Sequence, residues 1–163
     1  MSDGSVNLWS AQSIVGHHPV KGQNSVSDAL LSHSEHHKGQ VLSLQFHPVQ
    51  PNLLCSGATD GEVFIWDLAA PRQPKPSKPN PSAKTQAPTQ HNNAVTCVAW
   101  NKKSVQILAT SDSLGETTIW DLRQKRSIVT LRNSSRIQVR TSGISWSPDA
   151  VRMTEIYINA IGM

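Results

Sequence analysis

Hydrophobic and polar positions alternate along most of this chain in short runs, a period typical of β-strands rather than helices. One such run is VLSLQF at 41–46, and another is VTCVAW at 95–100. Each is followed by an apolar run that ends at small polar residues, and then by a third run that ends in Trp-Asp. Apolar runs of this length, bounded by turn residues, predict short strands in an all-β protein.

The strand pattern occurs twice, at an interval of 54 residues. The octet GEVFIWDL at 61–68 returns as GETTIWDL at 115–122, and the difference between 115 and 61 is 54. HKGQVLSLQF at 37–46 aligns with HNNAVTCVAW at 91–100 at the same interval. An ungapped register over about thirty positions indicates an internal repeat of one structural unit.

Two incomplete copies flank the whole ones. DGSVNLW places Asp3 and Trp9 at the spacing of Asp60 and Trp66. Near the end, TSGISWSPD repeats the VLSLQFHP pattern, with Trp146 as its aromatic residue. The chain therefore contains two whole units and two partial ones.

Each whole unit predicts three short strands and a more variable fourth. Asp60-Gly61 is a strong hairpin signal, because both residue types tolerate the positive φ of a tight turn. Such a unit is one blade of a β-propeller. We therefore expect an all-β fold, a partial propeller of two complete blades plus two partial ones.

These motifs resemble those of WD-repeat β-propeller proteins. In that family a His before the first strand, a Ser or Thr on the second, an Asp in the second turn and a Trp on the third form a hydrogen-bonded set. The resemblance assigns this structural set to His37, Ser56, Asp60 and Trp66 in one blade, to His91, Thr110 and Trp120 in the next, and to Asp3 and Trp9 in the first partial blade.

The second whole blade departs from this pattern, because Leu114 stands at the Asp position. We expect its set to lack an anion, at a cost of roughly 1–3 kcal/mol, unless Asp112 reaches in instead. In the last partial unit Ile137 stands where a His is expected. Buried Trp and His donors need acceptors, so these sets are interpreted as structural rather than catalytic.

The expected organisation is the end of a first blade (1–10), a blade connection with a His-rich segment (11–36), a complete blade (37–68), a Pro-rich basic insertion (69–90), a second complete blade (91–132), the start of a further blade (133–150) and an atypical truncated terminus (151–163). The prolines of the insertion favour a polyproline-like loop over a full fourth strand. Propellers close with about four to eight blades, so we expect no cooperative folding as a monomer.

The chain carries a net charge of +4, and its basic residues gather in a stretch from Leu122 to Pro148 that contains no acid. Such a strip attracts anionic lipid, RNA or an acidic protein face, or else forms a solvated loop. The candidate residues are Arg123, Lys125, Arg126, Arg132, Arg136 and Arg140.

Other chemistry is weakly represented. Cys55 and Cys97 lie among apolar and β-branched residues, which predicts buried free thiols in a reducing compartment. No apolar run approaches the roughly 18 residues of a membrane helix, so we expect a soluble intracellular protein.

Five histidines between His17 and His37 raise the idea of a metal site, but they lack Cys and acids at ligand spacing. We expect no metal, no cofactor and no enzyme activity, since no nucleophile, paired carboxylate or phosphate loop accompanies them.

The sequence between and around the repeats resembles the N-terminal propeller of the large outer-coat subunits of the COPII vesicle coat, over roughly residues 1–150. Its distinctive points are Asn101 directly after Trp100 and the Pro-rich insertion. The resemblance implies a structural scaffold in endoplasmic reticulum to Golgi transport, located in the cytoplasm, at the endoplasmic reticulum membrane and on coated vesicles. It implies as protein partners a smaller WD-repeat coat subunit and inner-coat proteins. It implies membrane association only through the coat, no nucleic acid and no small-molecule substrate.

A second interpretation is a WD-repeat adaptor in nuclear or signalling complexes, because fold does not imply function. In that case the basic strip would bind an acidic peptide or RNA. Localisation separates the two interpretations.

Overall fold

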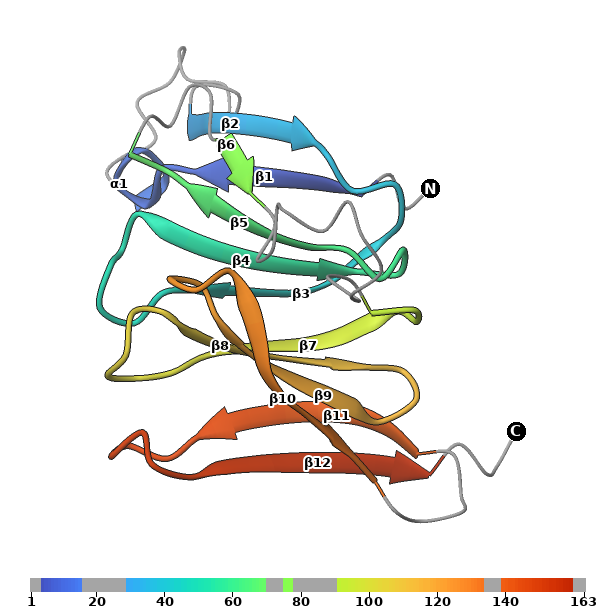
Figure 1. Ribbon diagram of the computed structural model, residues 1–163. Coiled ribbons are helices and arrows are strands. Elements are labelled where there is room, and N and C mark those ends of the chain that lie inside the picture. Colours follow the sequence, from blue (N-terminus) through green and yellow to red (C-terminus); the bar gives the residue numbers. More distant parts are fainter. Residues whose placement is uncertain (1–3, 16–28, 70–74, 78–90, 134–138, 160–163) are drawn as a thin grey trace.

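Four antiparallel sheets lie side by side in a computed structural model of the chain, which describes residues 4–15, 29–69, 75–77, 91–133 and 139–159 (Figure 1). In chain order the elements are β1 (Ser5–Trp9), α1 (Ala11–Val15), β2 (Leu30–Glu35), β3 (Val41–Phe46), β4 (Leu53–Ala58), β5 (Val63–Asp67), β6 (Lys75–Ser77), β7 (Val95–Trp100), β8 (Ile107–Asp112), β9 (Glu116–Asp121), β10 (Arg126–Arg132), β11 (Val139–Trp146) and β12 (Met153–Asn159).

The two whole repeats each form a four-stranded sheet. We call β3–β6 blade 2 and β7–β10 blade 3, and the two-stranded sheets β1–β2 and β11–β12 half-blade 1 and half-blade 4. The repeat extends to strand register, because Leu54 lies opposite Trp66 in blade 2 as Leu108 lies opposite Trp120 in blade 3. The expected fold, two complete blades plus two partial ones, is confirmed.

The half-blades contain strands that the sequence pattern did not predict. Strand β2 lies within 11–36, the expected connection, and pairs with β1 through Val6 opposite Ser34. Strand β12 lies within 151–163, the expected atypical terminus, and pairs with β11 through Trp146 opposite Met153. Backbone groups beside an existing strand gain hydrogen bonds by pairing with it, which outweighs a weak side-chain pattern.

The Pro-rich insertion also supplies a strand, although only a short one. Residues 75–77 form β6, which pairs with β5 through Ile65 opposite Ser77 and Trp66 opposite Pro76. Proline lacks an N–H, and β6 tolerates it because it is the outer strand of blade 2. Three residues of the insertion therefore form the fourth strand of blade 2.

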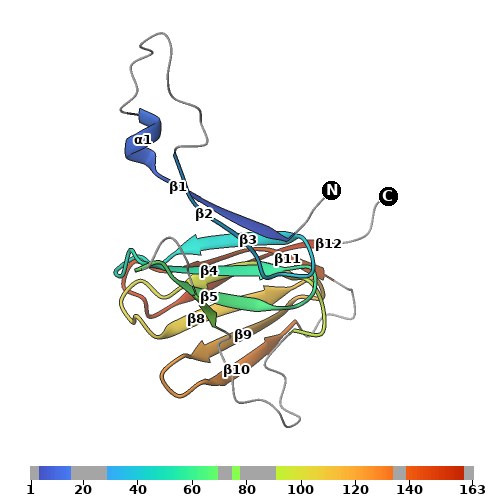
Figure 2. The same cartoon turned by 90° about the horizontal axis from the view of Figure 1, so that it is seen from above.

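The core lies between blades rather than within one. A single cluster joins Cys55, Val63 and Ile65 of blade 2 to Val95, Val98, Trp100, Leu108 and Trp120 of blade 3. Strand β7 contacts both β3 and β11, and Figure 2 shows β3 and β11 along one side of the molecule with β10 at the opposite side. Blades 2 and 3 thus bury their facing apolar side chains against each other.

Both cysteines are buried and free, as expected. Burial raises the pKa of the Cys55 thiol far above its usual range, so this thiol is unreactive. Helix α1 spans five residues and projects away from the sheets in Figure 2. Within the described ranges, no helix has the length and apolarity needed to cross a bilayer.

Gly61 sets the approach of blade 2 to blade 3. Its φ is 78°, and a Cβ at this position would lie 2.1 Å from the carbonyl oxygen of His91. We expect Gly61→Ala to lower the free energy of unfolding by about 2–4 kcal/mol, because it adds both left-handed strain and a backbone clash. Urea unfolding measures the change.

The matched control is Gly143→Ala on β11. A Cβ there would approach no atom closer than 3.5 Å, and those nearest atoms belong to the Ile156 side chain. We expect a change below about 1 kcal/mol. Equal losses in the two variants would show that the contact at Gly61 is not the cause.

Candidate functional site

Blade 2 brings its four predicted polar residues together. Ser56 Oγ accepts a hydrogen bond from the indole Nε1 of Trp66 at 2.8 Å and lies 2.7 Å from His37 Nε2. The Asp60 carboxylate lies 3.7 Å from the other ring nitrogen of His37. Ser56 and Trp66 are buried, with exposures of 0% and 1%. The set therefore joins the loop before β3 to strands β4 and β5.

Asp60 and His37 each affect the pKa of the other. Burial alone would raise the pKa of Asp60, but the N–H groups of Glu62 and Lys38 donate to its carboxylate, and the net effect lowers its pKa. Burial lowers the pKa of His37, against the opposing attraction of Asp60. The network is thus built on an ionised Asp and a neutral His.

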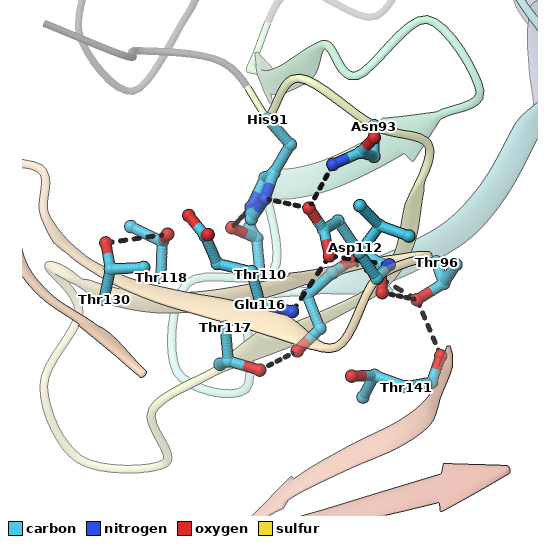
Figure 3. A network of polar contacts seen from close by, with 12 residues as sticks. His91, Asn93, Thr96, Thr110, Asp112, Glu116, Thr117, Thr118, Thr130 and Thr141 are labelled. Carbon is cyan, nitrogen blue, oxygen red and sulfur yellow. Dashed lines mark hydrogen bonds and ion pairs between the residues drawn. The ribbon is translucent and has the colours of Figure 1, made fainter. Parts of the chain in front are cut away.

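Blade 3 contains the equivalent network, and Figure 3 shows its His91, Thr110 and Asp112. Thr110 Oγ1 lies 2.8 Å from His91 Nε2 (Figure 3). The same oxygen accepts from Trp120 Nε1 at 2.8 Å. The carboxylate beside the second ring nitrogen belongs to Asp112, whose Oδ2 lies 3.5 Å from His91 Nδ1. The two blades therefore share one arrangement of side chains, but the carboxylate comes from Asp60 in blade 2 and from Asp112 in blade 3.

The expectation that Leu114 leaves blade 3 without an anion is wrong, and the alternative through Asp112 holds. Asp112 ends β8, so its side chain enters the turn from two residues earlier. Its Oδ1 accepts from the N–H groups of Leu114 at 3.0 Å and Glu116 at 2.9 Å, and its Oδ2 accepts from Asn93 Nδ2 at 3.1 Å. The Leu114 side chain is 47% exposed, so it takes no part in the network.

The charge on Asp112 is held firmly in the folded chain. Burial would raise the pKa of this carboxyl, but hydrogen bonds from His91, from the Glu116 and Leu114 amides and from Asn93 outweigh it and lower the pKa to about 2. The carboxylate is 2% exposed. A buried anion with this many donors is a structural anchor of the turn.

Ser56, His37 and Asp60 have the residue types of a hydrolase triad, but not its accessibility. A nucleophilic Ser must meet its substrate, whereas Ser56 is 0% exposed and its oxygen already accepts from Trp66. A cavity of about 100 Å³ lies on blade 3 beside His91, Glu116 and Thr118. This volume is below the roughly 300 Å³ at which small-molecule sites begin.

Among the described residues, one group of side chains has ligand atoms close enough together to hold a metal ion. The ligand atoms of His37, Asp60 and Glu62 lie within 4.8 Å of one another. Both Asp60 oxygens accept from backbone N–H groups and His37 Nε2 faces Ser56, so the blade network accounts for the cluster. A metal ion would have to displace those hydrogen bonds.

The His-rich segment makes ordinary polar contacts where it is described. His33 Nδ1 lies 2.6 Å from the Asn7 amide oxygen, and His33 Nε2 lies 3.0 Å from Glu35 Oε1. His36 Nδ1 pairs with the Ser34 hydroxyl at 2.7 Å. Of these contacts, the one between His33 and Asn7 joins β2 to β1, and the other two lie within β2 and the residues that follow it.

The structure separates the predicted basic strip into parts. Arg123, Lys125 and Arg126 are exposed at the turn between β9 and β10. Arg126 and Arg132 are the first and last residues of β10, which places them roughly 20 Å apart. Arg132 also pairs with Glu116 at 2.8 Å. The unpaired positive charge therefore concentrates at the turn.

The remaining predicted positions are dispersed. Trp9 is on β1 and is 41% exposed, so the described part of half-blade 1 has no buried Trp network. Arg140 is exposed on β11. Several predicted or discussed positions lie outside the described residues, namely Asp3, His17, His18, Arg136 and Ile137.

Blades of this topology with His–Ser/Thr–Trp networks define a class of protein, the repeat-built β-propellers. The family model "WD domain, G-beta repeat" matches residues 12–67 and 83–121, more than half of the chain. The chain belongs to this WD-repeat family.

Individual proteins similar to this chain carry names that refer to protein transport. The chain is 38% identical over 149 residues to "Protein transport protein SEC31" of Dictyostelium discoideum, covering 91% of this chain and 10% of the relative. It is 38% identical over 132 residues to the protein of the same name from Mycosarcoma maydis, covering 81% of this chain and 8% of the relative. The resemblance to COPII outer-coat subunits is confirmed, and the chain spans about a tenth of these relatives' length.

Solved structures show the same fold. A chain of "COPII on membranes, outer coat vertex" matches with a TM-score of 0.70 and 24% identity, over 96% of this chain and 39% of that chain. A chain of "Crystal Structure of Mitotic Checkpoint Complex" matches with a TM-score of 0.64 and 22% identity, over 96% of this chain and 40% of that chain. Fold alone therefore does not choose between pathways.

The role of Asp112 can be tested by substitution. We expect Asp112→Ala to lower the free energy of unfolding by about 2–4 kcal/mol, because the N–H groups of Leu114, Glu116 and Asn93 lose their acceptor. We expect Leu114→Asp to change it by less than about 0.5 kcal/mol, since that side chain is exposed. Urea unfolding decides, and a large stabilisation by Leu114→Asp would contradict this assignment.

Asp112 also makes stability depend on pH. Its pKa in the fold is about 2, below the ordinary 3.8, so the unfolded chain takes up the proton first. The stabilisation by the charged form is complete above about pH 5 and declines as the pH falls through about 4 towards 2. We expect the stability difference between the wild type and Asp112→Asn to shrink by about 1 kcal/mol between about pH 6 and pH 3. Parallel pH profiles of the two proteins would refute the assignment.

Proposed function

We propose that this chain is part of the propeller of a structural COPII coat component, which acts as a protein-interaction scaffold in endoplasmic reticulum to Golgi transport. The observation that carries the proposal is the similarity to relatives named as protein transport proteins, 38% identical over 91% of the chain. Other relatives of this name, from Coccidioides immitis, Danio rerio and Mus musculus, are 32–35% identical. The similarity runs through the half-blades and connections as well as through the repeat motifs.

The site geometry supports a scaffold rather than a catalyst. The polar networks of blades 2 and 3 are buried and hold strands together, and their hydroxyl groups are engaged by Trp donors. We therefore propose that the exposed surfaces act by contact with proteins. The proposed partners are a smaller WD-repeat coat subunit and inner-coat proteins, and the proposed location is the cytosolic face of the endoplasmic reticulum membrane and its coated vesicles.

One observation favours a second candidate function. Arg123, Lys125 and Arg126 form an exposed positive turn without an ion pair among the interactions described for them. Such a turn suits an adaptor that binds an acidic peptide. This second function predicts a different location and a dependence on those charges.

Imaging of the tagged, complete gene product tests the proposal. We expect puncta that coincide with a marker of COPII exit sites, because a coat component assembles where vesicles form. A diffuse nuclear signal would refute the coat function and favour the adaptor.

The charge reversal Arg123→Glu, Lys125→Glu, Arg126→Glu serves as the matched variant. These side chains are exposed, so we expect an unchanged fold and unchanged puncta if the coat function is right. A protein that relocates on charge reversal would instead depend on the basic turn, as the adaptor function requires.

A further inference from the structure

Two connections of blade 3 meet at the end of the sheet where β7 and β9 finish. Residues 101–106 join β7 to β8, and residues 122–125 join β9 to β10. The N–H of Leu122 donates to the carbonyl oxygen of Gln106 at 2.9 Å, so the two connections are in contact. Both lie at the same end of the sheet in Figure 2.

Exposed cations gather on these two connections and on the first residue of β10. We call this surface the basic end of blade 3, and its residues are Lys102, Lys103, Arg123, Lys125 and Arg126. Among the ion pairs between described residues, none involves any of the five. Arg132, at the other end of β10, pairs instead with Glu116 at 2.8 Å. The basic end therefore has positive charge available for a partner.

Buried and half-buried polar side chains hold the backbone under these cations. Asn101 is 5% exposed, and its Oδ1 accepts from the N–H groups of Lys103 at 3.1 Å and Ser104 at 2.9 Å. In the other connection, Asp121 Oδ1 accepts from the N–H groups of Arg123 at 2.9 Å and Gln124 at 3.1 Å. Connections that are already ordered lose less conformational freedom when a partner binds.

The backbone of the β9–β10 turn does not account for the lysine at its tip. Lys125 has a φ of 53°, in the left-handed region. Glycine reaches this region without a steric penalty, whereas a side chain is strained there. A role for the charge of Lys125 does account for a lysine at this position.

Blade 2 has the same connections without the charge. The N–H of Leu68 donates to the carbonyl oxygen of Asn52 at 2.7 Å, the contact that Leu122 makes with Gln106 in blade 3. At the 54-residue interval, however, Lys102, Lys103 and Arg123 correspond to Pro48, Val49 and Ala69. The cations are therefore specific to blade 3 and are not required by the architecture of the repeat.

The basic end is a strip rather than a broad face. Its connections cover the ends of the four strands of blade 3, and neighbouring strands lie about 4.8 Å apart, so the strip is about 14 Å long. In the adjacent half-blade 4, Arg152 pairs with Asp149 at 3.6 Å. An extended peptide covers about 14 Å with four or five residues, at about 3.4 Å per residue.

We propose that the basic end of blade 3 binds a short, extended acidic segment of a partner protein. The proposal rests on the scaffold function proposed above, and it adds the β7–β8 connection to the basic turn. A strip of charge suits a single chain, whereas an anionic membrane presents a plane of charge. No aromatic side chain occurs in residues 101–106 or 122–126, so these connections offer no stacking surface for the bases of RNA.

Fluorescence anisotropy with the purified complete gene product tests the proposal. The probe is a fluorescein-labelled peptide with about five consecutive Asp and Glu residues. We expect saturable binding at about 50 mM salt that weakens about tenfold or more at about 500 mM, because salt screens exposed charges. No binding of the peptide would overturn the proposal. Tighter binding to phosphatidylserine vesicles or to single-stranded RNA than to the peptide would overturn it too.

A pair of charge reversals locates the contact. Lys103→Glu with Arg123→Glu should weaken peptide binding about tenfold or more, since one residue of each connection then repels the carboxylates. The matched control, Lys38→Glu with Arg140→Glu, changes the net charge equally on exposed residues at the end where β3 and β11 begin. We expect the control to change binding less than about twofold. Equal losses in the two variants would show that net charge, not this surface, binds the peptide.

Lys125→Gly separates binding from stability. It removes a cation and relieves the left-handed strain, so we expect binding about threefold weaker and an unfolding midpoint that is unchanged or higher. A Lys125→Gly protein that binds as the wild type would overturn the placement of the segment over this turn. Failure here is distinct from failure of the coat function, because peptide binding is measured in solution and the coat function by imaging.

Discussion

The indole donors of Trp66 and Trp120 impose the constraint on which the rest of this structure depends. Each is buried, and each finds its acceptor in the hydroxyl of a residue on the neighbouring strand, Ser56 or Thr110. The same hydroxyl meets a His from the loop before the blade. A buried indole N–H without an acceptor costs free energy, so this contact fixes the register of three segments at once.

Blade-to-blade packing follows from that register. A blade has two apolar faces and cannot cover either by itself, so the largest cluster joins Val63 and Ile65 of one blade to Val95 and Leu108 of the next. Leu44 and Phe46 are exposed on the face of β3 where a further pair of inner strands would lie.

The buried networks leave function to the surface. Their hydroxyl, imidazole and carboxylate groups are engaged in holding turns and strands, so they position loops rather than perform chemistry. The matches to COPII and mitotic checkpoint structures have the same fold. What separates pathways in such proteins is the exposed sequence between the network residues. Relatives that are 38% identical to this chain are named as protein transport proteins.

The sequence by itself determined the repeat, the two whole blades and their network residues, because the 54-residue interval places Trp, Ser or Thr, and His at fixed spacings. The tertiary structure decided the rest. Asp112 replaces the anion missing at Leu114, since the end of β8 aims its carboxylate into the turn. Strands β2, β6 and β12 form where a neighbouring strand offers backbone hydrogen bonds. The local residue pattern does not predict them, because backbone hydrogen bonds to a neighbour do not depend on side-chain type.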